Sequence, residues 1–158
     1  SRGFSERKRS NQVRHHMDST FEVSYEQRQG IATIRTDVGV IGEIVMDSRN
    51  VPREKRGGNA SALLVAAALT CFCGTLREAL EARNIPFHSI HARGKGLKKS
   101  NPSGAVRLTS LDIEAAVDID DQYAEALAHC ISLVKDCMIT ASLADGIKVT
   151  HSARRRKI

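Results

Sequence analysis

Short stretches in which apolar and polar residues alternate recur along the chain and predict β-strands. Three of them lie close together, at residues 21–26, 31–36 and 40–46, with a turn at 27–30. Such a succession favours an antiparallel meander. A further strand is expected at 89–92, the most regular one at 109–119, and a last one at 147–153. Residues 94–104 are polar and glycine-containing, and predict a hairpin loop.

Apolar residues recur with helical spacing after the charged loop 47–58 and predict a long helix. Asn59 or Ser61 is the expected N-cap, and the helix should run to about Arg83. Its first half is apolar on all sides, which is typical of a central, buried helix. Asn84 suits a left-handed C-terminal cap, and Pro86 ends the helix.

A second helix is expected after the capping pair Asp120 and Asp121, and a short third helix from Met138 to just before Gly146. The second helix carries an apolar stripe at steps of four and three residues, and this stripe should face the core. Its members are Tyr123, Leu127, Cys130, Val134 and Cys137. The element order β-β-β-α-β-β-α-α-β predicts an α+β fold.

Length and charge limit the remaining possibilities. The 158 residues suit one domain at 19–154, with a flexible basic arm at 1–18 and a basic tail at 155–158. The net charge of +6 resides in the two ends and the body is mildly acidic, so no specific nucleic-acid partner is expected. The longest apolar run, 62–73, is shorter than the ~18 residues that span a bilayer. No leader segment is visible, so we expect a cytoplasmic protein with no membrane partner and with reduced cysteines.

The candidate chemistry lies in the cysteines. Cys71 sits within the apolar helix and Cys137 at the break between two helices, and two thiols that meet in space can reduce a peroxide. The alternative is inert packing, which is the usual fate of a cysteine on an apolar helix. Cys73 should face away from Cys71 and be structural, and Cys130 should belong to the core. The cysteine spacings do not match a zinc site, so neither a metal nor a cofactor is expected.

Several stretches resemble the OsmC/Ohr family, over about 21–153. They are Asn59-x11-Cys71-Phe72 with its Ala-rich run, Cys71-x3-Thr75-Leu76, Asn84-Ile85-Pro86, and Cys137-Met-Ile-Thr-Ala-Ser-Leu143, which is similar to the family's Cys-Pro-(Val/Ile)-x-x-x-Leu. The resemblance implies an OsmC-like fold, with a long central helix packed on sheets, in an intertwined homodimer with two interface active sites. It implies reduction of organic hydroperoxides, with Cys71 as the peroxidatic and Cys137 as the resolving cysteine. An external dithiol would restore the pair.

The apolar neighbours of Cys71 would raise its pKa, so a cation is needed nearby. In the family an arginine held by a glutamate supplies this charge, and Arg53 and Arg49 are the nearest candidates, with Arg28 as an alternative. The family's glutamate falls on Ser61, so the arginine loses its usual anchor. The second hypothesis is therefore an OsmC-like protein without efficient peroxidase activity that binds a small apolar ligand at the dimer interface.

Overall fold

The computed structural model describes residues 18–134, 137–147, 149–152 and 154–156. The chain divides into two compact units, Ser1–Arg56 and Gly57–Ile158. The predicted basic arm lies outside the described residues except for Asp18.

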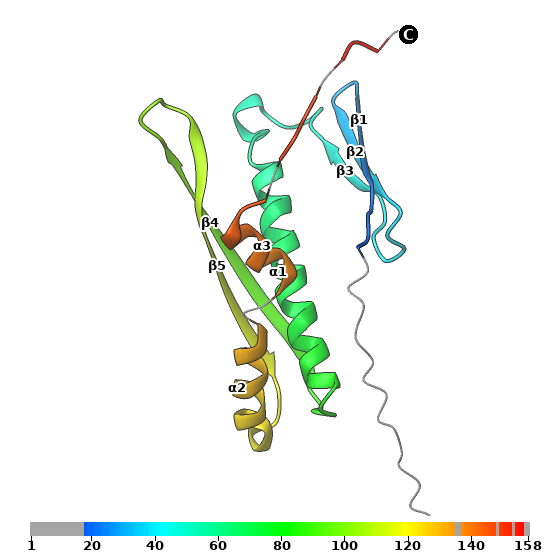
Figure 1. Ribbon diagram of the computed structural model, residues 1–158. Coiled ribbons are helices and arrows are strands. Elements are labelled where there is room, and N and C mark those ends of the chain that lie inside the picture. The colour runs from blue at the N-terminus through cyan, green and yellow to red at the C-terminus, as the bar shows by residue number, and fades with distance from the viewer. Residues whose placement is uncertain (1–17, 135–136, 148, 153, 157–158) are drawn as a thin grey trace, which may run out of the picture. The chain divides into compact units, whose positions relative to one another are not determined.

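The first unit is the predicted antiparallel meander (Figure 1). It consists of β1 (Val23–Arg28), β2 (Ile31–Thr36) and β3 (Ile44–Asp47), followed by the 3-10 turn η1 (Arg53–Lys55). β3 is shorter than expected, because only 44–47 pair with β2. Ala32 is the one buried hydrophobic residue in the described part of this unit, whereas Phe21, Val23, Tyr25 and Val45 are exposed.

The second unit is built around α1 (Asn59–Glu81). The N-cap is Gly58, with φ +88, so the expected caps Asn59 and Ser61 lie inside the helix instead. A left-handed N-cap conformation suits glycine, which has no Cβ to clash. Asn84 has φ +53, which confirms the predicted left-handed residue after the helix.

The strands β4 (Ser89–Ser100) and β5 (Val106–Asp118) form a long antiparallel hairpin (Figure 1). The predicted loop at 94–104 is therefore wrong for most of its length. Residues up to 100 join the sheet because they pair with β5, with one shift in register between Leu97 and Lys98. This pairing decides their conformation in spite of their weak preference for strands. The turn is limited to 101–105, where the Asn101 side chain accepts hydrogen bonds from the backbone N–H groups of Ser103 and Ala105.

The two glycines of β4 let side chains of α1 and β5 lie close to this strand. A Cβ on Gly94 would collide with the Val65 side chain and come within 3.3 Å of Leu69. A Cβ on Gly96 would lie 3.0 Å from Leu108 Cδ1. Gly94 therefore serves close contact between β4 and α1, and Gly96 leaves room for a side chain of β5.

The C-terminal helices close the core of the second unit. Asp120 caps the 3-10 turn η2 (Asp121–Tyr123), as predicted, and α2 (Ala124–Leu133) and α3 (Met138–Asp145) follow. The apolar stripe predicted for the second helix faces inward. It packs against the C-terminal part of α1 and forms one core cluster with it. This cluster contains Leu76, Leu80, Ile85, Cys130, Val134 and Cys137.

The predicted last strand is not formed in the described residues of 147–153. A strand needs a partner edge, and the described residues of this segment pair with none. Ile147 and Val149 are 61% and 76% exposed, so their alternation covers no sheet face in the single chain. The predicted α+β class is confirmed, and the element order is confirmed as far as α3.

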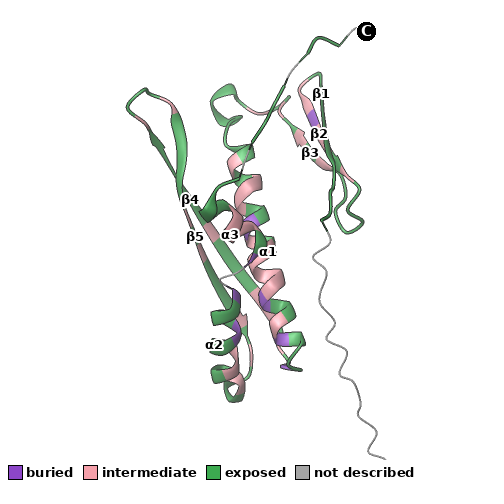
Figure 2. Ribbon diagram, in the orientation of Figure 1, coloured by how far each residue is buried: buried purple, intermediate pink, exposed green. Residues whose placement is uncertain are grey.

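Much of α1 is uncovered (Figure 2). Its buried residues are Ala68, Leu76 and Leu80. By length and composition, the helical stretch Arg53–Glu81 is able to cross a membrane, with an 18-residue window of mean hydropathy 1.7 that is 11% buried. The uninterrupted apolar run 62–73 is shorter than the apolar part of this helix. Isolated Ser and Thr residues break the run but hardly lower the mean hydropathy.

Candidate dithiol site

The two cysteines singled out above meet in the second unit. Cys71, in the middle of α1, and Cys137, the N-cap of α3, are 66 positions apart in the chain, and their sulfur atoms are 2.7 Å apart. Both are free thiols, with Cys71 half-buried and Cys137 only 1% exposed. Because a disulfide bond is about 2.05 Å long, the sulfurs need to approach by roughly 0.7 Å to become linked.

The other two cysteines lie apart from this pair. Cys130 is fully buried, and its thiol donates a weak hydrogen bond to the Ala79 carbonyl at 3.7 Å, two turns further along α1 than Cys71. Cys73 is half-buried, and burial raises the pKa of its thiol. The helix stripe thus presents Cys130 and Cys137 to the same core, but only Cys137 reaches Cys71.

The first turn of α3 points its backbone donors at the sulfurs. The Ile139 N–H donates to Cys71 Sγ at 3.4 Å. The Cys137 carbonyl accepts the first helical bond of α3, from Ala141 N–H at 2.9 Å, so the preceding N–H groups have no intrahelical acceptor. These donors escaped the sequence analysis, although the helix start expected at Met138 was a signal for them.

Burial raises the pKa of the Cys71 thiol above its ordinary value, and the neighbouring Cys137 raises it further. The backbone N–H groups of Ile139 and Met138 act in the opposite direction. For Cys137 burial also acts to raise the pKa, but hydrogen bonds with Cys71, Thr140 and Ile139 outweigh it, so the pKa of Cys137 is lowered. The pair therefore shares one proton after its first ionisation, and the negative charge favours Cys137.

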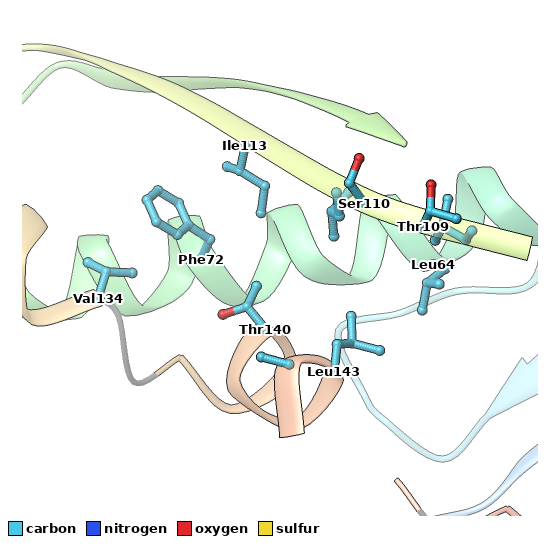
Figure 3. A pocket seen from close by; sticks show the side chains of 11 residues that line it. Leu64, Phe72, Thr109, Ser110, Ile113, Val134, Thr140 and Leu143 are labelled. Atoms are coloured by element: carbon cyan, nitrogen blue, oxygen red, sulfur yellow. The ribbon is translucent and has the colours of Figure 1, made fainter. Parts of the chain in front are cut away.

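A cavity of about 640 Å³ lies between α1, β5 and α3 (Figure 3). Phe72, adjacent to Cys71, and Thr140, adjacent to the start of α3, both border it. Its lining is mainly apolar, with hydroxyl groups from Thr109, Ser110 and Thr140. This composition suits a ligand with a hydrocarbon body and one or two polar atoms.

The predicted arginines lie in the first unit. Arg49 makes a bidentate ion pair with Asp47, with contacts of 2.6 and 2.9 Å, which lowers the pKa of that carboxyl to about 2. Arg28 pairs with Glu26 at 3.3 Å, and Arg53 begins the turn η1. All these ion pairs are exposed and carry little stability. Among the described residues of the second unit, no arginine contributes to the pKa of Cys71.

Among the described residues, no group of three or more His, Cys, Asp or Glu side chains could hold a metal ion.

The comparisons with known proteins agree with this architecture. The family model described as OsmC-like protein matches residues 53–152. An OsmC-like protein from Mycoplasma pneumoniae is 19% identical, with a TM-score of 0.60 over 81% of this chain and 89% of that one. An organic hydroperoxide resistance protein from Legionella pneumophila is also 19% identical, with a TM-score of 0.53 over 79% and 89%. A hypothetical protein from Aquifex aeolicus is 15% identical, with a TM-score of 0.59 over 81% and 89%.

The comparison with curated proteins found no match. At these identities the solved structures share the fold with this chain, and the family model spans well over half of its residues. Its match contains the helix of Cys71, the β4–β5 hairpin and the α3 start at Cys137. The chain therefore belongs to the OsmC-like protein family.

Proposed function

We propose that the chain reduces organic hydroperoxides, with Cys71 as the peroxidatic and Cys137 as the resolving cysteine, in defence against oxidative stress. The observation that carries this proposal is the 2.7 Å separation of two sulfurs held by different helices. Inert core cysteines need no such partner, whereas a dithiol that cycles through a disulfide does.

The reaction starts from the singly ionised pair. The Cys71 thiolate attacks the distal oxygen of ROOH, the O–O bond breaks, and Cys71 becomes a sulfenic acid. The departing alkoxide takes the proton of the Cys137 thiol and leaves as ROH. The Cys137 thiolate then attacks the sulfenic sulfur, expels hydroxide and forms the disulfide. An external dithiol supplies the two electrons that restore both thiols.

The apolar cavity supports an organic rather than an inorganic peroxide as substrate. Leu64, Phe72 and Leu143 offer a hydrocarbon surface, and Ser110 adds a hydroxyl group to the lining (Figure 3). The Legionella protein with the same fold is described as an organic hydroperoxide resistance protein, which agrees with this substrate class.

The raised pKa of Cys71 requires further activation, and we assign it to an arginine of the first unit. Arg49 has a carboxylate partner in Asp47, which orients the guanidinium as the family's glutamate would. Arg53 is the other candidate. Substitution of each by alanine, with Lys55→Ala as the control, should identify the activating residue by its loss of peroxide turnover.

We further propose a cytoplasmic homodimer in which a second copy covers α1. A membrane is a poor alternative cover, because β4 and β5 contact α1 and pair only with each other in the described residues. Their outer edges present unpaired N–H and C=O groups, which a hydrocarbon layer does not tolerate. Light scattering should give twice the subunit mass of 17.3 kDa. A monomer at micromolar concentration would contradict the dimer.

Treatment of the reduced protein with cumene hydroperoxide tests the chemistry. Mass spectrometry should find a Cys71–Cys137 disulfide, and Cys71→Ser should abolish turnover. Cys137→Ser should leave one reaction and a trapped sulfenic acid on Cys71, open to overoxidation. Cys73→Ser, a change of a half-buried thiol on the same helix, is the matched control and should turn over normally. Peroxide that leaves both thiols unmodified would refute the proposal.

A second function is favoured by the raised pKa of Cys71 and by Ser61, which has no carboxylate for an arginine. In this alternative the chain binds a small apolar ligand in the same cavity without efficient turnover. Saturable binding of cumyl alcohol by calorimetry, together with thiols that resist the hydroperoxide, would support binding over catalysis.

A further inference from the structure

The free end of the β4–β5 hairpin carries charges and apolar side chains that peroxide reduction does not use. We propose that this hairpin tip, residues 97–109, binds the protein to the surface of an anionic lipid bilayer. Figure 1 shows the turn of the hairpin away from the helices of this unit, where a flat surface can reach it. The contact does not depend on the chemistry of the thiols, and it can be measured without any peroxide.

The hairpin tip is cationic. It contains Lys98, Lys99 and Arg107, which are exposed, and no Asp or Glu. Lys99 and Arg107 lie directly opposite each other in the ladder, and like charges in this position destabilise a hairpin. Further from the turn the charges balance, since Arg93 lies opposite Glu114. Among the described residues none of the three tip cations forms an ion pair, so an external anion would relieve their repulsion.

Apolar side chains lie among these cations. Leu97, Val106 and Leu108 are exposed, and Leu108 pairs with Lys98 across the ladder. The phosphates of a nucleic acid would attract the cations and leave the exposed hydrocarbon in water. A bilayer interface takes both, because lipid phosphates lie at its surface and acyl chains lie just below. The composition of the hairpin tip therefore favours an anionic membrane.

The turn that closes the hairpin has its backbone donors satisfied. The Asn101 N–H donates to the Ala105 carbonyl, and the Gly104 N–H donates to the Asn101 carbonyl. The Asn101 side chain accepts from the N–H groups of Ser103 and Ala105, and Pro102 has no N–H. Every N–H of the turn is thus bonded within it. Transfer of the turn from water to the bilayer interface would leave no donor without a partner, which removes the main cost of such a transfer.

A surface contact differs from a membrane span. The open edges of β4 and β5 stay in water, so the constraint that argues against a bilayer around α1 does not apply. The expectation of no membrane partner rested on the lack of a spanning run, and a surface contact needs none. Thr109 lines the end of the 640 Å³ cavity opposite to Val134 (Figure 3). Binding through the hairpin tip would therefore bring one end of this cavity to the lipid.

A single fluorophore can locate the contact. The chain contains no tryptophan, so Val106→Trp places the only one in the hairpin tip. Vesicles of phosphatidylglycerol and phosphatidylcholine in equal parts should shift its emission to the blue, and phosphatidylcholine alone should not. Val45→Trp on β3 is the matched control, because Val45 is 57% exposed and Val106 is 58% exposed, and it should not respond.

Three results would overturn the proposal. The first is an unchanged Val106→Trp spectrum, or an equal response of both variants. The second is an emission that is already blue-shifted without lipid, which would mean that a second copy covers the hairpin tip. The third is a response to duplex DNA but not to the vesicles, which would assign the hairpin tip to nucleic acid.

A charge substitution keeps the apolar side chains in place. The test variant combines Lys98→Gln, Lys99→Gln and Arg107→Gln. Each cation near an anionic surface contributes about a factor of five, so flotation at low salt should show roughly a hundredfold weaker partition into the same vesicles. The control removes three exposed cations elsewhere, with Lys55→Gln, Arg83→Gln and Lys95→Gln. Both variants have the same net charge and the same basic ends, so an equal loss in both would refute a role of the hairpin tip.

Discussion

Oxidation of the dithiol should stabilise the protein strongly, because the bond would close a loop of 66 positions in the unfolded chain. The chain-entropy model gives about 4 kcal/mol for a loop of this length. For a chain of this size that corresponds to a rise in the midpoint of thermal unfolding of roughly 8 to 16 °C. Strain in the native state can only reduce this value, and the 2.7 Å approach of the sulfurs keeps the required movement small.

The assay compares thermal unfolding, followed by circular dichroism, of the reduced protein and of protein oxidised by cumene hydroperoxide and then freed of it. Dithiothreitol should reverse the rise. Cys137→Ser should show none, and Cys73→Ser should retain it in full. A disulfide seen by mass spectrometry with midpoints within 2 °C of each other would refute the loop-closure argument. Absence of the disulfide would refute the pairing itself.

Three further substitutions test the fold around the site. Gly94→Ala should lower the free energy of unfolding in urea by about 1–3 kcal/mol, since its Cβ would collide with Val65, and an unchanged midpoint would show that β4 lies further from α1. Leu76→Ala, at a fully buried position, should cost about 2–5 kcal/mol, and a cost below 1 kcal/mol would place Leu76 outside the core. Asp120→Ala should cost about 1 kcal/mol by removing the cap on the Gln122 N–H, whereas Asp120→Asn should cost much less.

The elements that the sequence predicted well are those whose pattern follows from their own packing. α1, the antiparallel meander and the inward stripe on α2 were all found, because helical or strand spacing determines which side chains share a face. The expected loop at 94–104 was wrong because pairing with β5, a tertiary effect, decides that segment. The sequence predicted an N-cap residue with a capping side chain, Asn59 or Ser61. The N-cap of α1 is instead Gly58, with φ +88.

The dithiol shows the same division between local and tertiary information. Spacing placed Cys130 and Cys137 on one stripe, and it offered no way to decide which of them meets Cys71. That choice depends on where α2 ends and α3 begins, since the break brings Cys137 beside Cys71 while Cys130 lies against Ala79. The family resemblance selected Cys137, and the structure provides the physical reason.

The activating cation could not be chosen from sequence, because the candidate arginines and the thiols belong to different units of the chain. The first unit supplies Arg49 already fixed by Asp47, whereas the second supplies a thiol whose pKa burial has raised. Neither half is sufficient for the proposed chemistry. In the proposed peroxidase, desolvation of the thiol would favour a peroxide with a hydrocarbon body, and the same desolvation would make a donor or a cation indispensable. The reactivity of Cys71 thus depends on groups that act on its sulfur from outside α1, and the first of these is the start of α3.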